Sequence, residues 1–417
     1  MKNIYQLVIA LVILSSCSSE EIKDTPFTFP PEWEPQQAVW ISINDVWEFD
    51  REAYQIDTRL QLVKVLHQYV PVKILTNKDS LANTLLDSLL QMTVDTSRVT
   101  IIVHPQETYF LRDPGPLFLS NGTELRMANW QGIDSNSIKR NPNIALRKAV
   151  DDSLAIQFRY KVQNSPISYD GGAIEVNSHS AMSIQDNAMM HNKGSSSIEK
   201  IEKEILDMYG KQQMIWLKGV PLVEKNGLKV DNYWGYAPNG HIDAVARFAN
   251  DSTILVTTIS EEDKDKNPIA RHDYEIFQGY LRQLKEQRRI NGKPFTLIEI
   301  PSPDLSLHLV PIPLSYWTPE GLEKLYMDGL SKKTDIMLVV PALSYANYFV
   351  TNGAVLVPQY WEEGMPASEK EKDEKMVNIL KKYFPNRKII GFNVKEINLF
   401  GGGIHCVTQQ VPRINER

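Results

Sequence analysis

The chain has 417 residues, of which 42% are hydrophobic and 23% charged, and its formal net charge is −6. A mildly acidic chain lacks the basic surface of a nucleic-acid-binding protein, so no nucleic-acid partner is expected, whereas a cationic ligand is compatible with the charge. The length exceeds the size at which one hydrophobic core usually keeps growing, which predicts either two domains or an array of repeated units.

Residues 1–16 have the pattern of a secretory signal. A basic residue precedes an apolar run over 7–14 that is too short to cross a bilayer as a helix. Residues 14–17, Leu-Ser-Ser-Cys, resemble the cleavage box of bacterial lipoproteins. We therefore expect a signal peptide over 1–16, a lipid on Cys17 and a polar tether over 17–26. Ordinary cleavage nearby or a single uncleaved anchor would also fit this pattern.

These features predict an exported bacterial lipoprotein, anchored to a membrane in the periplasm or at the cell surface. The lipid would be its only membrane contact, because no later segment has eighteen uninterrupted apolar residues. With Cys17 modified, Cys406 is the only other cysteine. An internal disulfide and a zinc site built on thiolates are therefore excluded.

From residue 27 onward the chain repeats one pattern, in which an apolar strand and an amphipathic helix precede a second apolar strand. The clear copies pair residues 38–43 with 72–75, 181–184 with 214–217, 253–256 with 295–298, and 354–357 with 388–391, with helices over 51–69, 197–208, 272–289 and 368–383. A less regular fifth copy runs from Leu125 through Ile144 to Ile156. Such repeats bury their apolar faces on one another, so we expect a single domain over 27–417.

Cys406 follows the glycine run Gly401–Gly403. Glycines allow the backbone to approach a ligand closely and leave a neighbouring thiol accessible, although a free cysteine is often simply buried and inert. His241 and Asp243 are two residues apart, so on a strand their side chains share one face. An imidazole beside a thiol is how proteins generate a thiolate, which makes these residues candidates for nucleophilic catalysis.

Asp113 lies in a sequence that predicts a rigid turn, because prolines flank the following glycine. Taken alone, it could simply stabilise that turn. Asp170, which precedes Gly171 and Gly172, is a similar and weaker candidate. The chain contains no H-E-x-x-H, paired C-x-x-C, glycine-rich nucleotide loop or G-x-S-x-G motif, so the sequence indicates no metal and no cofactor.

Six motifs, in this order, resemble those of the family of agmatine deiminases and bacterial, Porphyromonas-type peptidylarginine deiminases. They are Pro31-Glu32-Trp33-Glu34-Pro35 with Ala38-Val39-Trp40, Arg112-Asp113-Pro114-Gly115-Pro116, Gly171-Gly172, Gly240-His241-Ile242-Asp243, Ser344-Tyr345-Ala346-Asn347 with Asn352-Gly353, and Gly401-Gly402-Gly403-Ile404-His405-Cys406. The resemblance spans nearly the whole chain after the leader. It implies a five-bladed α/β propeller of ββαβ units around a central active site, in agreement with the repeats.

The resemblance also implies hydrolysis of a guanidinium group to a ureido group and ammonia through a covalent thiouronium. Cys406 would be the nucleophile, His241 the general acid and base, and Asp113 and Asp243 the carboxylates that clasp the cation. Further residues that would line the substrate site are Phe110, Asp170, Asn347, Gly402 and Gly403. A planar guanidinium with donors in a fork suits two carboxylates, and neither metal nor cofactor is implied.

Two departures from the family pattern concern substrate selection. Phe110 stands where most members have Trp, and Asp170 stands where many agmatine deiminases have Glu. We favour agmatine, converted to N-carbamoylputrescine, because no arginine after Asp113 matches the spacing that peptidylarginine enzymes use for a carboxylate. Export instead favours a peptidylarginine deiminase that produces citrulline. A Cys-His-Asp hydrolase of amides and a catalytically silent binding lipoprotein are less favoured by these motifs.

Overall fold

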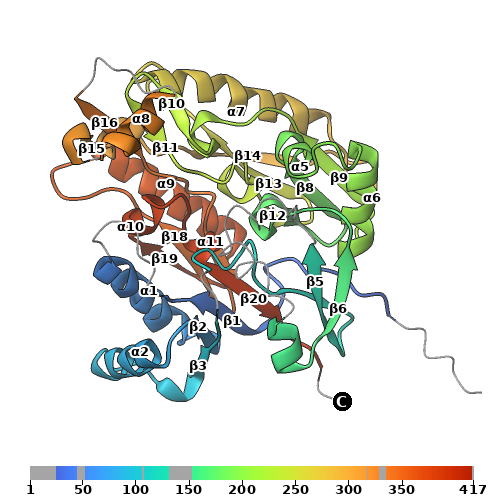
Figure 1. Cartoon of the computed structure of the whole chain (residues 1–417). Coiled ribbons are helices and arrows are strands. Elements are labelled where there is room, and N and C mark those ends of the chain that lie inside the picture. Colours follow the sequence, from blue (N-terminus) through green and yellow to red (C-terminus); the bar gives the residue numbers. More distant parts are fainter. Residues whose placement is uncertain are drawn as a thin grey trace, which may run out of the picture.

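The structure of the protein is a computed structural model, and it describes residues 25–44, 52–105, 108–130, 153–316, 318–327 and 335–415 (Figure 1). The predicted signal peptide and Cys17 lie outside the described residues, as do Ile144 and the middle of the fifth predicted repeat. Among the described helices, none is both long and apolar enough to span a membrane.

Five sheets of the described chain share one pattern: the first strand is antiparallel to the second, and the second is parallel to the third. Four of them are β4 (Leu117–Ser120), β5 (Leu125–Trp130), β6 (Lys161–Ser165); β7 (Glu175–Val176), β8 (Ser180–Ile184), β9 (Gln213–Leu217); β12 (Ala246–Asn250), β13 (Thr253–Thr258), β14 (Thr296–Pro301); and β17 (Phe349–Thr351), β18 (Ala354–Pro358), β19 (Lys388–Phe392). The fifth joins both ends of the chain, as β20 (Thr408–Pro412), β1 (Gln36–Ser42) and β2 (Val72–Thr76), extended by β3 (Val99–Val103).

Helices connect the parallel strands, as the repeats predicted. They are α1 (Glu52–Leu66) between β1 and β2, α5 (Gln185–His191) and α6 (Ile198–Tyr209) between β8 and β9, α7 (Pro268–Glu286) between β13 and β14, and α9 (Ala367–Tyr383) between β18 and β19; α2 (Asp79–Gln91) links β2 to β3. Local chemistry explains their ends. In α6 the Ser197 side chain accepts from the Lys200 amide, and Gly210 ends the helix at φ 61°.

The fifth predicted copy is partly wrong. Residues 125–130 form β5 as predicted, but the parallel partner is β6 over Lys161–Ser165 rather than a strand at Ile156. Ile156 lies in a helical segment over 153–158 and is 80% exposed. An apolar residue that faces solvent on a helix was thus mistaken for part of a buried strand, because one side chain does not define a period.

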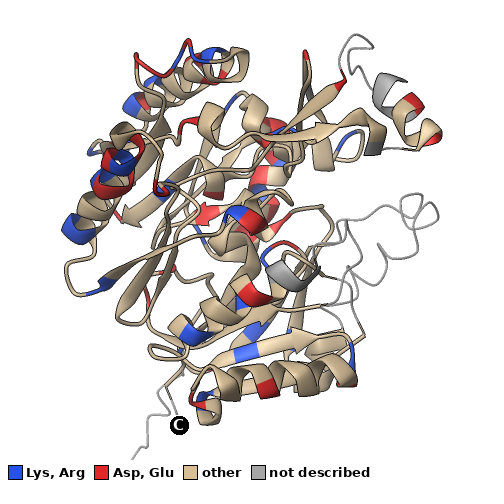
Figure 2. Ribbon diagram, turned by 90° about the vertical axis from the view of Figure 1, so that its left-hand side faces the viewer, with Lys and Arg blue, Asp and Glu red and all other residues tan. Residues whose placement is uncertain are grey.

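A further four-stranded sheet was not predicted at all. Its order is β10 (Leu228–Val230), β11 (Tyr233–Gly235), β16 (Ile336–Val340) and β15 (Val310–Pro313), and α8 (Pro319–Met327) connects its last two strands in the sequence. Figure 1 shows these strands and α8 together at one side of the molecule. Residues of both charge signs are interspersed along the outer helices (Figure 2), which fits the small net charge.

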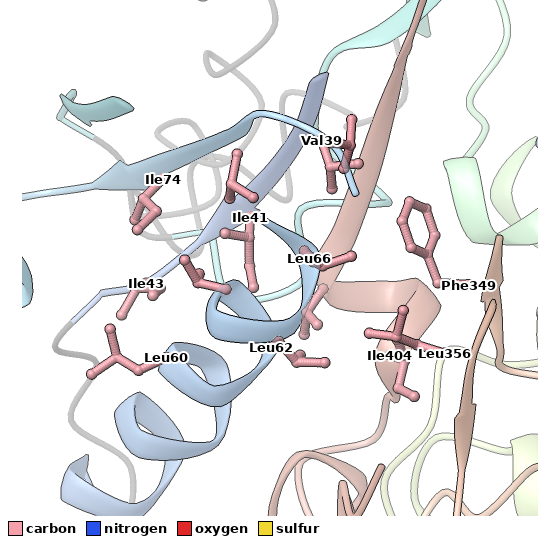
Figure 3. Packing of buried hydrophobic residues seen from close by; sticks show 14 of the residues in the cluster. Val39, Ile41, Ile43, Leu60, Leu62, Leu66, Ile74, Phe349, Leu356 and Ile404 are labelled. Atoms are coloured by element: carbon pink, nitrogen blue, oxygen red, sulfur yellow. The ribbon is translucent and has the colours of Figure 1, made fainter. Parts of the chain in front are cut away.

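The hydrophobic core lies between sheets and helices and extends to the C-terminal segment. In the cluster of Figure 3, Ile41 of β1 and Leu62 of α1 are fully buried in the same core as Ile404, which begins the short helix α11 (Ile404–Val407). Phe349 and Leu356 from the sheet β17–β18–β19 complete this side of the core. Burying such side chains contributes roughly 1.5 to 3 kcal/mol each, so α11 is firmly held.

Candidate active site

Four predicted site residues and Gly172, a glycine of the third motif, occupy equivalent places in the five sheets. Each lies within four residues of the start of a first strand: Asp113 before β4, Gly172 before β7, Asp243 before β12, Asn347 before β17 and Cys406 before β20. The contacts described below link all five. The structure therefore brings together motifs that are separated by almost 300 residues in the sequence.

Cys406 lies in α11 and is 6% exposed. Its Sγ is 3.3 Å from Nδ2 of Asn347 and 3.8 Å from Oδ2 of Asp243. Asn347 also accepts from the amide of His405 at 2.9 Å, which joins it to the same helix. A Cβ atom at Gly403 would lie 2.5 Å from Oδ1 of Asn347, so a glycine is needed for this close approach.

The surroundings of Cys406 keep its thiol protonated. Burial, followed by the negative charges of Asp243 and Asp113, raises the pKa of the thiol well above its ordinary value. A cation placed between the two carboxylates would oppose this shift. The site therefore favours formation of the thiolate when a cationic ligand is present.

His241 immediately precedes the turn that carries Asp243 and is 1% exposed. Its Nδ1 is 3.6 Å from Oδ1 of Asp113, and its Nε2 is 3.5 Å from Oδ2 of Asp170. Burial alone would lower the pKa of the imidazole, but the carboxylates of Asp113, Asp170 and Asp243 outweigh burial and raise it to about 10. His241 can therefore donate a proton at neutral pH.

Gly172 fills the narrow space between the imidazole and the carboxylates. A Cβ atom there would lie 2.5 Å from Nδ1 of His241, 2.9 Å from Oδ1 of Asp113 and 3.2 Å from Oδ2 of Asp243. The Gly172 amide donates to Oδ1 of Asp113 at 3.0 Å. A side chain at Gly172 would thus displace His241, the predicted acid and base, together with the predicted clamp residues Asp113 and Asp243.

The two predicted clamp residues differ in their titration. Burial and the charges of Asp170 and Asp243 raise the pKa of Asp113 to about 7, against the effect of His241. Burial alone would raise the pKa of Asp243. A hydrogen bond from His405 and nearby positive charges outweigh burial and lower this pKa. Within the described residues, Oδ1 of Asp243 has no hydrogen-bond partner, which leaves it able to accept from a ligand.

Aromatic rings stand beside the glycine run. A Cβ atom at Gly402 would lie 2.3 Å from Cε1 of half-buried Phe110, so these two predicted substrate-lining residues are in direct contact. Gly401 has φ +92° and passes close to the backbone oxygen of Tyr236, whose side chain is 56% exposed. Phe110 and Tyr236 thus flank the segment that leads to the thiol.

Several residues that contact this site were not assigned a role from the sequence. The His405 imidazole lies between Oδ2 of Asp243 and Oε2 of Glu32, at 2.7 Å from each. Both His405 and Glu32 belong to the six ordered motifs, which was the available signal. His191 Nε2 is 3.4 Å from Oδ2 of Asp170, and Glu224 accepts from the His241 amide at 3.3 Å. Neither of these two had a sequence signal.

Among the residues that the structure describes, no group of three or more His, Cys, Asp and Glu side chains is arranged to hold a metal ion. The candidate site has reactive side chains of its own. It combines a cysteine, an imidazolium and two carboxylates in one largely buried cluster, which suits nucleophilic attack on a bound cation.

Comparisons with known proteins find relatives that match nearly the whole chain. An agmatine deiminase of Pseudomonas aeruginosa is 24% identical over 400 residues, covering 93% of this chain and 95% of that protein. The structure of an agmatine deiminase of Enterococcus faecalis, 21% identical, covers 93% of this chain and 96% of its own with a TM-score of 0.69. That of the C. jejuni agmatine deiminase, 19% identical, covers 94% and 97% with a TM-score of 0.66.

These structures share the mixed α/β fold of this chain. The family model of the Porphyromonas-type peptidyl-arginine deiminases matches residues 28–412, which is nearly all of the described structure. The resemblance inferred from the six ordered motifs is thereby confirmed, and the protein belongs to the Porphyromonas-type peptidyl-arginine deiminase family.

Proposed function

We propose that this protein is a hydrolase that deiminates the guanidinium group of a small substrate, with agmatine as the first candidate. The observation that carries the proposal is the placement of Cys406 and His241 against Asp113 and Asp243 in one buried space. The family match and the agmatine deiminase activity named for the P. aeruginosa and E. faecalis relatives support it.

The substrate is first bound by attraction between its positive charge and the carboxylates of the site. A guanidinium presents planar N–H donors, and Asp113 and Asp243 supply carboxylate oxygens on its two sides. Its positive charge opposes the burial and the repulsion between negative charges that together raise the pKa of Asp113 and of the Cys406 thiol. Binding therefore promotes ionisation of both groups, whose protons leave to solvent, and the thiolate forms beside the carbon that it attacks.

The first half-reaction replaces ammonia by the thiol. The Cys406 thiolate forms a C–S bond to the guanidinium carbon, and the carbon becomes tetrahedral. His241 gives its proton to the departing nitrogen, the C–N bond breaks, and ammonia leaves. A positively charged thiouronium remains on Cys406, and His241 is now neutral.

The second half-reaction releases the product. Water attacks the same carbon from the place that ammonia vacated, and neutral His241 takes its proton as a C–O bond forms. The tetrahedral intermediate collapses, the C–S bond breaks, and the electron pair returns to sulfur, which takes up the remaining proton of the water as the C=O bond of the ureido group forms. The ureido product leaves, and Cys406 and His241 regain their initial states.

Agmatine is favoured over arginine because it lacks a carboxylate. The described arginines nearest the site are already engaged: Arg112 donates to Gln410 and to the His405 carbonyl, and Arg247 pairs with Glu32. Arg126 stacks on the Phe27 ring, 3.8 Å from its centre. The second candidate is a peptidylarginine deiminase, which the family model and the predicted export favour. Arg140 and Arg147 lie outside the described residues.

Steady-state kinetics with agmatine, free arginine and a peptide with C-terminal arginine will test the proposal. We expect the wild type to release ammonia from every substrate that it accepts and to have its highest kcat/KM with agmatine. Cys406→Ser should not turn over any of the three substrates. Cys17→Ala is the matched control, since it removes the other cysteine and should retain activity. A peptide preference of tenfold, which equals about 1.4 kcal/mol, would reject agmatine in favour of peptidylarginine.

We also infer that Cys17 carries lipid and holds the protein on a bacterial membrane. The support is the Leu-Ser-Ser-Cys sequence behind an apolar segment. Expressed in its bacterial host, the wild type should fractionate with membranes, whereas Cys17→Ala should appear in the soluble fraction. An unchanged distribution would contradict the lipid anchor.

We further infer that the five equivalent sheets are the blades of a propeller around the site. Support comes from their common strand pattern and from the position of one site residue before each first strand. A crystal structure in which these five first strands did not surround Cys406 would contradict this arrangement.

A further inference from the structure

One buried histidine beside the nucleophile takes no part in the proposed reaction. His405 directly precedes Cys406 in α11 and is 2% exposed. Its Nδ1 lies 2.7 Å from Oδ2 of Asp243, and its Nε2 lies 2.7 Å from Oε2 of Glu32. The imidazole therefore spans the distance between a predicted clamp residue and a carboxylate outside the predicted site.

The imidazole holds one of the two oxygens of Asp243. Oδ2 accepts the hydrogen bond from Nδ1 of His405 and lies 3.8 Å from Sγ of Cys406. Oδ1 is buried and has no hydrogen-bond partner among the residues that the structure describes. A buried carboxylate oxygen without a partner costs free energy until a ligand supplies a donor. A guanidinium N–H is such a donor, so binding depends on how the Asp243 carboxylate is oriented.

Glu32 fixes the other side of the imidazole. Its Oε2 also accepts from Nη2 of Arg247 at 3.1 Å, and its Oε1 accepts from the amide of Val350 in β17. Glu32 is thus anchored by partners outside the predicted site. Because both ring nitrogens of His405 have close partners, the ring cannot turn freely, and Nδ1 stays directed at Asp243.

The backbone around His405 is held by separate hydrogen bonds. The His405 amide donates to Oδ1 of Asn347 at 2.9 Å, and the His405 carbonyl accepts from Nε of Arg112 at 3.2 Å. The Arg112 amide donates to the Cys406 carbonyl at 3.0 Å. None of these three bonds uses the imidazole. A change of the His405 side chain therefore leaves the backbone contacts that place Cys406.

We propose that His405 is a positioning residue for guanidinium binding. It holds the Asp243 carboxylate by Oδ2, so that Oδ1 faces the guanidinium, and it does so from the position next to the nucleophile. The spacing between the thiol and this carboxylate therefore depends on one side chain. The inference rests on the proposed function, because it takes Asp243 to bind the cation.

Two substitutions separate the two contacts of the imidazole. The amide nitrogen of asparagine is as many bonds from Cβ as Nδ1 of histidine, so His405→Asn keeps a donor for Asp243 and loses the contact with Glu32. The amide nitrogen of glutamine corresponds to Nε2, so His405→Gln keeps the contact with Glu32 and loses the one with Asp243. His179→Gln, which replaces an exposed histidine, is the control.

Binding is measured by titration calorimetry in the Cys406→Ser background, so that turnover does not interfere. Agmatine and a peptide with C-terminal arginine are the two probes, because they share the guanidinium group and differ elsewhere. Urea denaturation of the same variants measures their stability. Ammonia release by the wild type is measured separately and tests the proposed function.

We expect His405→Gln to raise the Kd of each probe that the background binds by at least about tenfold, whereas His405→Asn and His179→Gln should stay within about threefold. Both His405 variants should lose stability, because each lacks one buried contact. A histidine that only stabilised the fold would weaken binding in both variants or in neither, and either result would overturn the proposal. If His405→Gln did not fold, a tenfold loss of binding in His405→Asn would overturn it.

The failure of this inference and the failure of the proposed function give different results. Ammonia release by the wild type, together with equal Kd values in His405→Gln and its background, would reject the inference alone. A wild type that released no ammonia from any guanidine would reject the proposed function, and the inference with it.

Discussion

Asp113 and Asp243 occupy one buried site, yet their surroundings shift their pKa values in opposite directions. Asp243 accepts a hydrogen bond of 2.7 Å from His405, and this contact together with nearby positive charges outweighs burial and lowers its pKa. Asp113 is raised to about 7 by burial and by the negative charges of Asp170 and Asp243. Asp243 is therefore the permanent negative charge of the site, and Asp113 is the carboxyl that titrates near neutrality.

The pH profile of kcat/KM should reveal this difference. In the wild type we expect kcat/KM to fall below about pH 7, as Asp113 takes up a proton and loses its charge for the cation. Asp170→Asn removes a like charge from Asp113, so the acidic limb should move to lower pH. It also removes a carboxylate that raises the pKa of His241, so the alkaline limb should move in the same direction.

The control is Asp207→Asn, which neutralises an exposed aspartate on α6 paired with Lys203. Its profile should match that of the wild type. If the Asp170→Asn profile kept both limbs in place, the charge of Asp170 would not govern the titration of the site, and the assignment of the acidic limb to Asp113 would be wrong.

At the scale of elements, the sequence predicted what local periodicity determines. Four parallel strand pairs and their helices were located correctly, because each strand is a short apolar run and each helix buries one face. Pairings between distant segments were not predictable in this way. β11 at Tyr233–Gly235 pairs with β16 at Ile336–Val340, and no local pattern records that contact.

The site likewise has residues that the sequence could predict and residues that only contacts between distant segments reveal. The nucleophile, the imidazole and the two clamp residues came from the resemblance and from residue chemistry, and the structure places them together. Their catalytic roles stay predictions. His191 could not be found from the sequence, because it lies at the end of a short helix, and only the fold places it beside Asp170.

At the scale of the molecule, a buried cluster of charged residues contacts the site through His405 and involves residues from all five sheets. Glu32, before β1, contacts His405 at 2.7 Å and Arg247 of β12 at 3.1 Å, and Arg112, before β4, is 3.8 Å away. Glu175 of β7 pairs with Arg247, and the amide of Val350 in β17 donates to Glu32. Because Glu32 is shared by so many elements, the predicted domain over 27–417 should unfold as one unit.

Replacing Glu32 tests whether this cluster holds the molecule together. Glu32→Gln removes the carboxylate that faces Arg112 and one of the two that pair with Arg247, and removing one partner of a buried pair typically costs about 3 kcal/mol. Burial alone would raise the pKa of Glu32, but Arg247, His405 and Arg112 outweigh it and lower the pKa to about 2. The charge of Glu32 therefore contributes stability above its ordinary pKa of 4.5, and this contribution is lost as the pH falls toward 2.

Urea denaturation at pH 7 should thus show a single transition in both proteins, with a lower free energy of unfolding for Glu32→Gln. The difference should narrow when the measurement is repeated below pH 4.5, because Glu32 of the unfolded wild-type chain then takes up a proton, whereas in the folded protein it stays ionised until the pH approaches 2. Glu34→Gln is the matched control, since Glu34 lies two residues away in the same segment and is exposed. Equal stability of Glu32→Gln and Glu34→Gln at pH 7 would mean that the buried cluster does not hold the five sheets together.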